Sequence, residues 1–398
     1  MKAIHLQTEY LTEPLGLGIT TPRFYWNCEG GVTQTAYQIT AKRGDQLYWN
    51  SGKILSSSMT HIAYGGIPLQ SRDVIDWTVQ LWDENDEPSE VSESRFEMGL
   101  LQPADWSADW IAGSYKPDPK RRYPVDCFKK DFTVKDKVVK ARLYASARGV
   151  YDVTINRRRI EDFILAPGAT DYRRRIQYQT YDVTSYILGN NTVELRLADG
   201  WFRGSVAAYG VTNVFGTQTS VLAQLELTYE NGETQVIGTD DTWAWSNDGP
   251  IRFADLKDGE VYNTTMQPTY SGKARVVTAP KGVALCASDN VPVMEHERFT
   301  PSLLPGKVLD FGQNIAGYLS FRIKGKKGQR IRIVCTELYD AKEQTVIRNA
   351  AETKPAAGWT QQKLIKKLMT QKVSGASVET PLQEILFTCS GGEDSYKT

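Results

Sequence analysis

Two short stretches of the 398-residue chain bring together side chains that could bind a small ring-shaped ligand. The sequence ADGWFRG places Asp199, Trp201 and Arg203 within five residues, and its glycines allow the backbone to turn sharply. The sequence TDYRRR adds Asp171 and Tyr172. Sugar binding requires an aromatic face for the C–H side of the ring and planar polar groups for its hydroxyls. These five residues are therefore the candidate substrate-binding set.

The same residues also allow a purely structural interpretation. Trp201 could fill a hydrophobic core at a tryptophan–glycine corner, and the neighbouring charges could form buried or peripheral ion pairs. The sequence alone does not separate binding from packing at this position.

Metal and nucleophile chemistry find little support in the sequence. His5, His61 and His296 are far apart and show neither metal-ligand spacing nor a Ser-His-Asp arrangement. The five cysteines are scattered without a CxxC pair, which favours reduced thiols packed as small hydrophobic groups. The sequence DLKDGE is a weak candidate for Ca²⁺, because Asp258 and Glu260 could bind the ion together with loop carbonyls. No other cofactor is expected.

The charge balance excludes some classes of partner. Lysine plus arginine and aspartate plus glutamate both number 47, so the formal net charge is zero. A nucleic acid or an anionic membrane surface requires a basic face, so neither is expected as a partner. No apolar run has the length of a spanning helix, and the start, MKAIHLQTEYLTEPLG, contains no hydrophobic export segment. We therefore expect a soluble, cytoplasmic protein.

Alternation of apolar and polar residues with period two predicts an all-β chain of tandem β-sandwiches. Residues 1–99 fit an immunoglobulin-like or fibronectin-like sandwich, in which Trp77, Val79 and Leu81 share one face of a strand. Residues 106–285 fit a larger sandwich, a jelly roll. Its strongest hairpin turns at Asn231-Gly232, a pair typical of a type I′ turn.

Residues 286–398 form a third segment. Residues 319–323 and 331–335 both alternate, which predicts that they pair with each other as a hairpin. From about residue 348 the sequence becomes alanine-rich and basic, unlike the residues before it. This atypical tail suggests an incomplete third domain, and a frameshift or misjoined reading frame is one hypothesis for its origin.

Several long motifs resemble one family. The jelly-roll segment contains LAPGATDYRRRIQYQTYDVT, LADGWFRG and GPIRFADLKDGEVYN, which resemble the N-terminal jelly-roll module of bacterial α-L-rhamnosidases. VLDFGQNIAGYLSFRIKGKKGQRIRI, with TELYD, resembles their concanavalin-like sandwich, and TPRFYWNCEGGVTQTAYQITAK resembles their immunoglobulin-like module. The resemblance covers residues 1–345 and follows the family's domain order.

The resemblance implies a family reaction but no catalytic residue in this chain. The family, glycoside hydrolase family 78, hydrolyses terminal α-L-rhamnose with inversion, using two carboxyl groups in an (α/α)6 barrel. No motif of that barrel is present here, so we expect no catalytic residue in this chain. The resemblance instead implies a non-catalytic, carbohydrate-associated β-domain part that is inactive alone. The expected partner is a rhamnose-containing glycan or glycoside bound by the middle domain, with help from Ca²⁺.

Two alternatives stay open at this point. The chain could be an active α-L-rhamnosidase that uses carboxylates of its β domains, although among 47 acidic residues a suitably spaced pair arises by chance. It could also be a scaffold or interaction protein, with the tail around Trp359 and Leu364 docking on a partner. The sequence also leaves open whether the chain forms a homo-oligomer.

Overall fold

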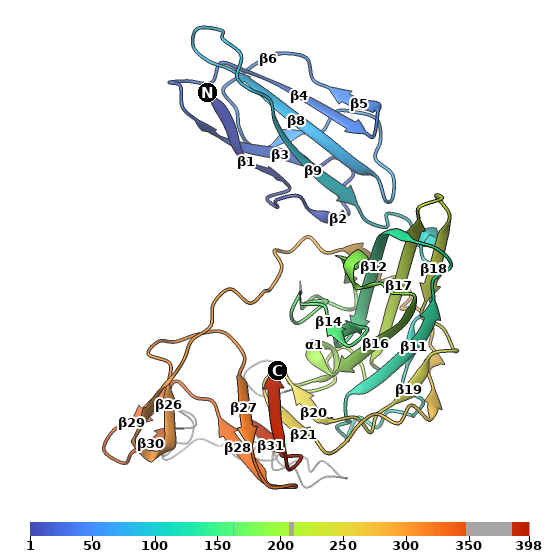
Figure 1. The fold of residues 1–398 in the computed structure, drawn as a ribbon, viewed down its shortest axis with the longest axis vertical. Helices are drawn as coiled ribbons and strands as arrows, with labels where there is room; N and C mark the ends of the chain where they lie inside the picture. The colour runs from blue at the N-terminus through green and yellow to red at the C-terminus, as the bar shows by residue number, and fades with distance from the viewer. Residues whose placement is uncertain (162, 207–210, 348–383, 398) are drawn as a thin grey trace.

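The computed structural model describes residues 1–161, 163–206, 211–347 and 384–397. Figure 1 shows an almost entirely β structure, which confirms the predicted fold class. Besides the strands, the described residues contain one short helix, α1 (Gly200–Arg203), and the 3₁₀ turns Pro103–Asp105, Thr184–Tyr186 and Pro305–Lys307. No helix within these ranges is long and apolar enough to cross a membrane.

The N-terminal region is a sandwich of two sheets. One sheet contains β1 (Lys2–Thr8), β3 (Arg23–Glu29) and β7 (Ile62–Ala63). The other contains β2 (Leu15–Leu17), β9 (Ser92–Met98), β8 (Val74–Trp82), β4 (Ala36–Arg43), β5 (Gln46–Asn50) and β6 (Ile54–Leu55). Along β8 the alternate residues Trp77, Val79 and Leu81 are fully buried, which confirms the face predicted from the sequence.

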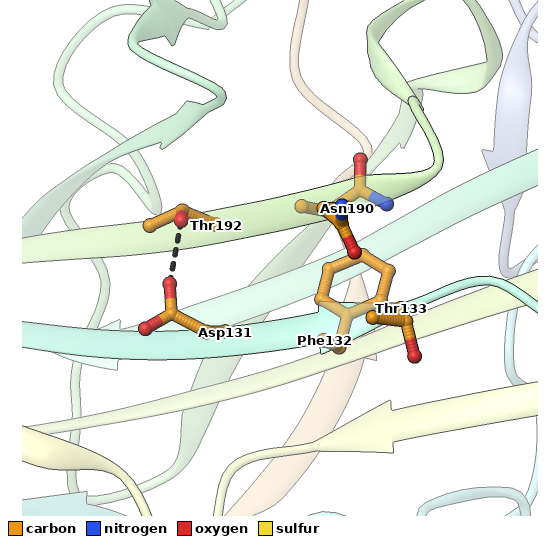
Figure 2. Close-up of a pocket in the computed structure, with 6 residues that line it drawn as sticks. Asp131, Phe132, Thr133, Asn190 and Thr192 are labelled. Carbon is orange, nitrogen blue, oxygen red and sulfur yellow. Dashed lines mark hydrogen bonds between the residues drawn. The ribbon is translucent and has the colours of Figure 1, made fainter.

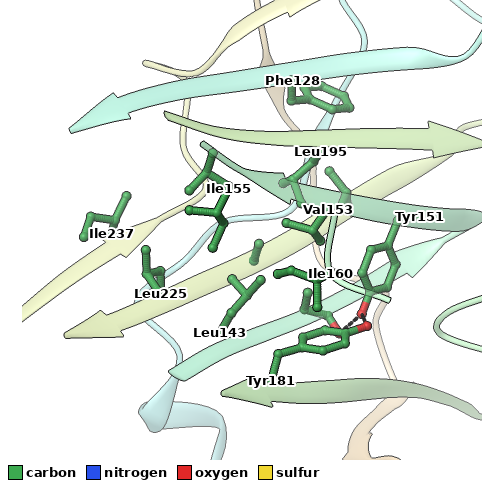
Figure 3. Packing of buried hydrophobic residues seen from close by; sticks show 14 of the residues in the cluster. Phe128, Leu143, Tyr151, Val153, Ile155, Ile160, Tyr181, Leu195, Leu225 and Ile237 are labelled. Atoms are coloured by element: carbon green, nitrogen blue, oxygen red, sulfur yellow. Dashed lines mark hydrogen bonds between the residues drawn. The ribbon is translucent and has the colours of Figure 1, made fainter. Parts of the chain in front are cut away.

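The middle region is a larger sandwich. Its first sheet contains β10 (Ile111–Ala112), β12 (Val138–Arg148), β15 (Arg175–Asp182), β17 (Ser220–Tyr229), β18 (Thr234–Gly238), β23 (Arg275–Val276) and β24 (Ala284–Ala287). Its second sheet contains β11 (Asp126–Thr133), β13 (Val150–Ile155), β14 (Arg158–Arg159), β16 (Asn190–Ala198), β19 (Ala244–Ser246) and β22 (Gly272–Lys273). Figure 3 shows the core between the sheets, where the Tyr151 and Tyr181 hydroxyls lie 3.0 Å apart.

The predicted β17–β18 hairpin is confirmed, but its turn is of another kind. A type I′ turn requires positive φ at both central residues. Only Gly232 of the Asn231-Gly232 pair adopts a positive φ, of 84°. The Gly232 N–H donates to the Tyr229 carbonyl at 2.9 Å, and the Tyr229 N–H donates to the Glu233 carbonyl at 2.9 Å. The loop is therefore one residue longer than expected, with glycine in its left-handed position.

The C-terminal region pairs strands that are far apart in the sequence. One sheet has the order β20 (Ile251–Asp255), β21 (Gly259–Asn263), β31 (Glu384–Thr388) and β28 (Arg330–Val334). The two-stranded sheets are β25 (Ser302–Leu304) with β26 (Val308–Asp310), β27 (Ser320–Lys324) with β32 (Glu393–Lys397), and β29 (Leu338–Asp340) with β30 (Thr345–Ile347). The β20–β21 hairpin thus comes from the segment predicted as jelly roll, yet it pairs with strands of the last segment.

The predicted hairpin between residues 319–323 and 331–335 is wrong. β27 pairs with β32 and β28 pairs with β31, because the chain end supplies both partners. Phe387 and Tyr396 from these last strands are buried, and Phe387 packs against Tyr262 with ring centroids 5.8 Å apart. Residues 384–397 of the tail are therefore part of a core, whereas residues 348–383 lie outside the described residues.

The N-terminal sandwich is joined to the middle region by buried hydrogen bonds. The Tyr178 hydroxyl on β15 accepts from the Leu100 N–H at 2.7 Å and donates to the Leu100 carbonyl at 3.0 Å. Arg72 also bridges the two regions, since it binds Glu226 on β17 at 2.7 Å. The N–H and the carbonyl of Leu100 thus both hydrogen-bond to the Tyr178 hydroxyl.

Replacing Tyr178 by phenylalanine should destabilise the protein by about 1–3 kcal/mol, because two buried backbone groups lose their partner. The matched control is Tyr144→Phe, which removes the hydroxyl of a neighbouring buried tyrosine whose ring centroid lies 6.3 Å from that of Tyr178. Urea denaturation of the two variants and the wild type measures the difference. Equal stabilities for the two variants would contradict a linking role for Tyr178.

Glu260 on β21 is a partly buried residue whose carboxyl lies where the last strands meet the middle region. Burial raises its pKa to about 7, although a hydrogen bond from Tyr396 and the nearby Arg196 favour the charged form. The Tyr396 hydroxyl on β32 donates to Glu260 Oε1 at 2.9 Å. The carboxyl therefore contacts the chain end and faces a charge from β16.

Replacing Glu260 by glutamine should change how stability depends on pH. The usual pKa of this side chain is 4.5. As pH rises from about 4.5 to 7, the unfolded chain loses the proton while the folded protein keeps it, so the wild-type free energy of unfolding falls across this window. The neutral variant lacks this fall and should gain about 2–3 kcal/mol relative to the wild type between pH 4.5 and 8.

Chemical denaturation in steps of pH checks this expectation. Glu93→Gln, at an exposed position on β9, serves as the control and should follow the wild-type curve. A stability difference between Glu260→Gln and wild type that stays constant with pH would contradict the burial argument.

Candidate functional site

The predicted site residues gather around the single-turn helix α1, directly after β16. Gly200 adopts a φ of +51°, and a Cβ there would lie 2.5 Å from Val150 Cγ2. The position therefore requires glycine. The turn presents Phe202 and Arg203 to different neighbours, so the site has an aromatic side and a polar side.

The polar side is a buried ion pair. Arg203 Nε donates to Asp199 Oδ1 at 2.7 Å, and Arg203 Nη1 donates to the Tyr115 hydroxyl at 3.0 Å. Both charged side chains are only 3–4% exposed. Arg122 lies nearby, with Nε 3.5 Å from Asp199 Oδ2, and it also pairs with Asp255. Asp199 and Arg203 therefore hold the turn in place and do not face solvent.

Asp126 on β11 extends this polar network. It accepts hydrogen bonds from Trp245 Nε1 at 2.9 Å and from the Tyr115 hydroxyl at 3.1 Å. Burial raises the pKa of Asp126 to about 6, even though Arg203 favours its charged form. The carboxyl is fully buried and its partners belong to the protein, so it supports the aromatic residues around it.

The aromatic side is built on Tyr172. Its ring meets Phe202 edge-on at a centroid distance of 5.4 Å, and Phe215 lies at 5.2 Å. Its hydroxyl donates to the Gly168 carbonyl at 3.0 Å, and burial raises its pKa. Trp201 packs against the same cluster and is partly exposed. The structure thus places Tyr172 and Trp201 in one aromatic cluster.

Asp171 lies at the edge of the aromatic side. It is partly exposed, and its Oδ1 accepts from Arg173 Nε at 2.8 Å. The hydrogen bonds from Arg173 lower the pKa of Asp171. The five predicted residues therefore separate into Tyr172 and Trp201 in the aromatic cluster, Asp171 at its edge, and a buried pair on the other side of α1.

Sequence reasoning missed Arg148, the last residue of β12. Its guanidinium carbon lies 5.6 Å from the Trp110 ring centroid and 5.9 Å from that of Phe202. Its Nε donates to Ser220 Oγ at 2.7 Å. The strand pattern contains a signal for this placement, because Ala145 and Ala147 face the core and the following residue must face outward.

The two weak calcium candidates do not meet. Asp258 Oδ2 accepts from Ser205 Oγ at 2.5 Å and lies 3.7 Å from Arg122 Nη2, and burial raises its pKa. Glu260 faces Tyr396 instead. Ca²⁺ takes six to eight oxygen ligands. Across the described ranges, no group of three or more His, Cys, Asp or Glu side chains could hold a metal ion. The residues do not fit the ion.

A shallow hollow of about 470 Å³ opens elsewhere, between the ends of β11 and β16 (Figure 2). Its lining consists of Asp131, Phe132, Thr133, Asn190, Asn191 and Thr192. Asp131 accepts from Thr192 Oγ1 at 2.5 Å, and the Asn191 amide bonds to Leu188 on both its oxygen and its nitrogen. Because Asp131, Asn191 and Thr192 already have partners and no lining residue is a predicted site residue, we place the candidate site at α1.

Three family models match the chain. The immunoglobulin domain of Rha78A-like proteins matches residues 3–102, the α-L-rhamnosidase N-terminal domain matches residues 136–297, and the bacterial α-L-rhamnosidase concanavalin-like domain matches residues 305–363. The order is the predicted one. The exact boundaries of the three predicted domains stay predictions.

Relatives and solved structures agree with these models. An α-L-rhamnosidase of Alteromonas is 33% identical over 358 residues, which is 82% of this chain and 39% of that protein. The Aspergillus terreus enzyme matches with a TM-score of 0.82 and 29% identity, over 99% of this chain and 45% of the other. A Streptomyces avermitilis α-L-rhamnosidase complexed with L-rhamnose, at 22% identity, shares the fold with a TM-score of 0.79 over 100% of this chain and 54% of the other.

The chain thus spans about two fifths of the curated α-L-rhamnosidase that it matches. The matched part is the part that carries the β domains in the order expected for these enzymes. By these matches, the chain corresponds to the N-terminal β domains of α-L-rhamnosidases.

Proposed function

We propose that this chain is the carbohydrate-associated β-domain part of an α-L-rhamnosidase, and that its middle domain binds rhamnose-containing glycans or glycosides. The observation that carries the proposal is the cluster of Trp201 and Tyr172 beside α1. A relative of the same fold was solved in complex with L-rhamnose, which supports this ligand class.

Within this proposal, Trp201 contacts the ligand, because its indole is partly exposed while it packs on the cluster. Tyr172 is only 4% exposed and its hydroxyl is engaged, so it supports the indole from behind. Asp171 at the edge supplies a carboxylate for sugar hydroxyls. Asp199 and Arg203 act as positioning residues, since their ion pair fixes the turn that carries Trp201.

We further propose that the β domains do not hydrolyse the glycosidic bond. Hydrolysis with inversion needs two carboxyl groups on either side of a bound sugar. The two carboxyls whose pKa burial raises to about 6 and 7, Asp126 and Glu260, accept hydrogen bonds from the aromatic side chains of Trp245 and Tyr396. Asp131 is the only acid that lines the hollow of Figure 2. These placements count against the alternative in which β-domain carboxylates form an active site.

Replacing Trp201 by alanine should weaken binding of methyl α-L-rhamnoside at least tenfold, a loss of about 1.4 kcal/mol, because the apolar sugar face loses its stacking partner. Isothermal titration calorimetry on the full chain measures the dissociation constant. The control is Trp82→Ala, which removes a partly exposed indole of the N-terminal sandwich that lies under Lys53. Equal weakening by both substitutions, or no binding by the wild type, would overturn the proposed site.

An aryl α-L-rhamnoside tests the proposal of no hydrolysis. Concentrated purified chain should release no aglycone above the level of a heat-inactivated sample. Release that tracks the folded protein would overturn the non-catalytic assignment and would favour carboxylates of the β domains as the catalytic groups.

A further inference from the structure

Arg148 carries a charge that no carboxylate compensates within the described ranges. The side chain is partly buried, and Ser220 Oγ, which accepts from its Nε, is its one hydrogen-bond partner there. The other arginines near α1 are paired, Arg203 with Asp199 and Arg122 with Asp255. Arg148 is therefore an exception in its own neighbourhood, and its two Nη groups are available as donors.

The surroundings of Arg148 partly remove its guanidinium from water, which disfavours the charged form. The Arg148 guanidinium carbon lies 5.6 Å from the ring centroid of Trp110 and 5.9 Å from that of Phe202. Burial lowers the pKa of Arg148. An aromatic face attracts a cation but supplies no hydrogen-bond acceptor for the Nη groups. A partly desolvated guanidinium without a counter-ion gains more from a bound anion than an exposed one does.

The face near Arg148 has an excess of positive charge. Through Phe202 and Tyr172 the aromatic cluster reaches Phe215, and the guanidinium of Arg173 lies 5.5 Å from the centroid of that ring. The run of residues 173–175 is three arginines, of which two pair with Asp171 and one with Asp289. On this side Arg173 and Arg174 share the single carboxylate of Asp171, and Arg148 has none within the described ranges, so this imbalance favours an anionic ligand.

We propose that Arg148 binds the anionic group of an acidic sugar unit, a uronate carboxylate or a sulfate ester, while the sugar ring lies on the aromatic side of α1. Both groups present two oxygens that match the parallel N–H donors of a guanidinium. The inference rests on the proposed saccharide binding at this face and specifies its ligand class. The neutral hydroxyls of rhamnose itself leave this charge without a partner, so the acidic unit is a neighbour of rhamnose in the glycan.

The test compares sugars that differ in one group. Methyl β-D-glucuronide and glucose 6-sulfate are titrated against the full chain, with methyl β-D-glucoside and methyl α-L-rhamnoside as neutral references. The wild type should bind at least one anionic sugar tenfold or more tightly than methyl β-D-glucoside, and 0.5 M NaCl should reduce this preference. A preference for the carboxylate alone or the sulfate alone identifies the group, and either result supports the proposal.

Three variants locate the effect. Arg148→Gln should abolish the preference while neutral sugars bind within twofold of wild type, and Arg148→Lys should retain part of it because the charge stays but the paired donors are lost. Arg158→Gln is the matched control, since Arg158 also lies over a ring, that of Tyr186 at 4.2 Å, on the other sheet. Thermal unfolding of each variant shows whether it is folded, and the lysine variant keeps the test decisive if the glutamine variant unfolds.

The outcomes separate this inference from the proposed function. Binding of methyl α-L-rhamnoside without any preference for anionic sugars would overturn the role of Arg148 and leave rhamnoside binding standing. A preference that survives in Arg148→Gln would also overturn it. Absence of binding for all four sugars would overturn both proposals.

Discussion

The buried ion pair between Asp199 and Arg203 is the constraint on which the candidate site depends. It closes one helical turn directly after β16, and Gly200 lets the backbone enter that turn against Val150. Because the two charges are almost completely excluded from water, removing Asp199 would leave the Arg203 charge buried without its carboxylate partner, at a cost of several kcal/mol. The pair therefore fixes the direction in which Trp201 and Phe202 leave the turn.

The polar network around this pair is also a framework for aromatic residues. Tyr115 hydrogen-bonds to both Arg203 and Asp126, and Trp245 donates to the same Asp126 carboxylate. A change at any of these groups would alter the partners of the others, so we regard them as one unit. The buried charges of Asp199 and Arg203 hold the turn, while the aromatic rings and Arg148, which has no carboxylate partner among the described residues, lie on the outer face of the first sheet.

The sequence predicts what depends on local pattern. Period-two alternation predicts the all-β class and the buried face of β8, and the structure confirms both. What it missed is non-local. Nothing in residues 319–335 shows that β27 and β28 would pair with the chain end, because pairing between distant strands depends on tertiary packing. The partner of a charge is equally non-local: the sequence leaves open whether Arg203 contacts a ligand or forms an ion pair, and the structure shows its buried pair with Asp199.

The parallel pairing of β21 with β31 has a consequence for synthesis of the chain. The two strands are about 120 residues apart in the sequence, so β21 leaves the ribosome long before its partner exists. At a translation rate of roughly 5–20 residues per second, one edge of the β20–β21 hairpin waits on the order of ten seconds with its N–H and C=O groups unpaired. Open strand edges invite pairing with other chains. This sheet is therefore open to aggregation while the chain is on the ribosome, and a nascent-chain chaperone would protect it there.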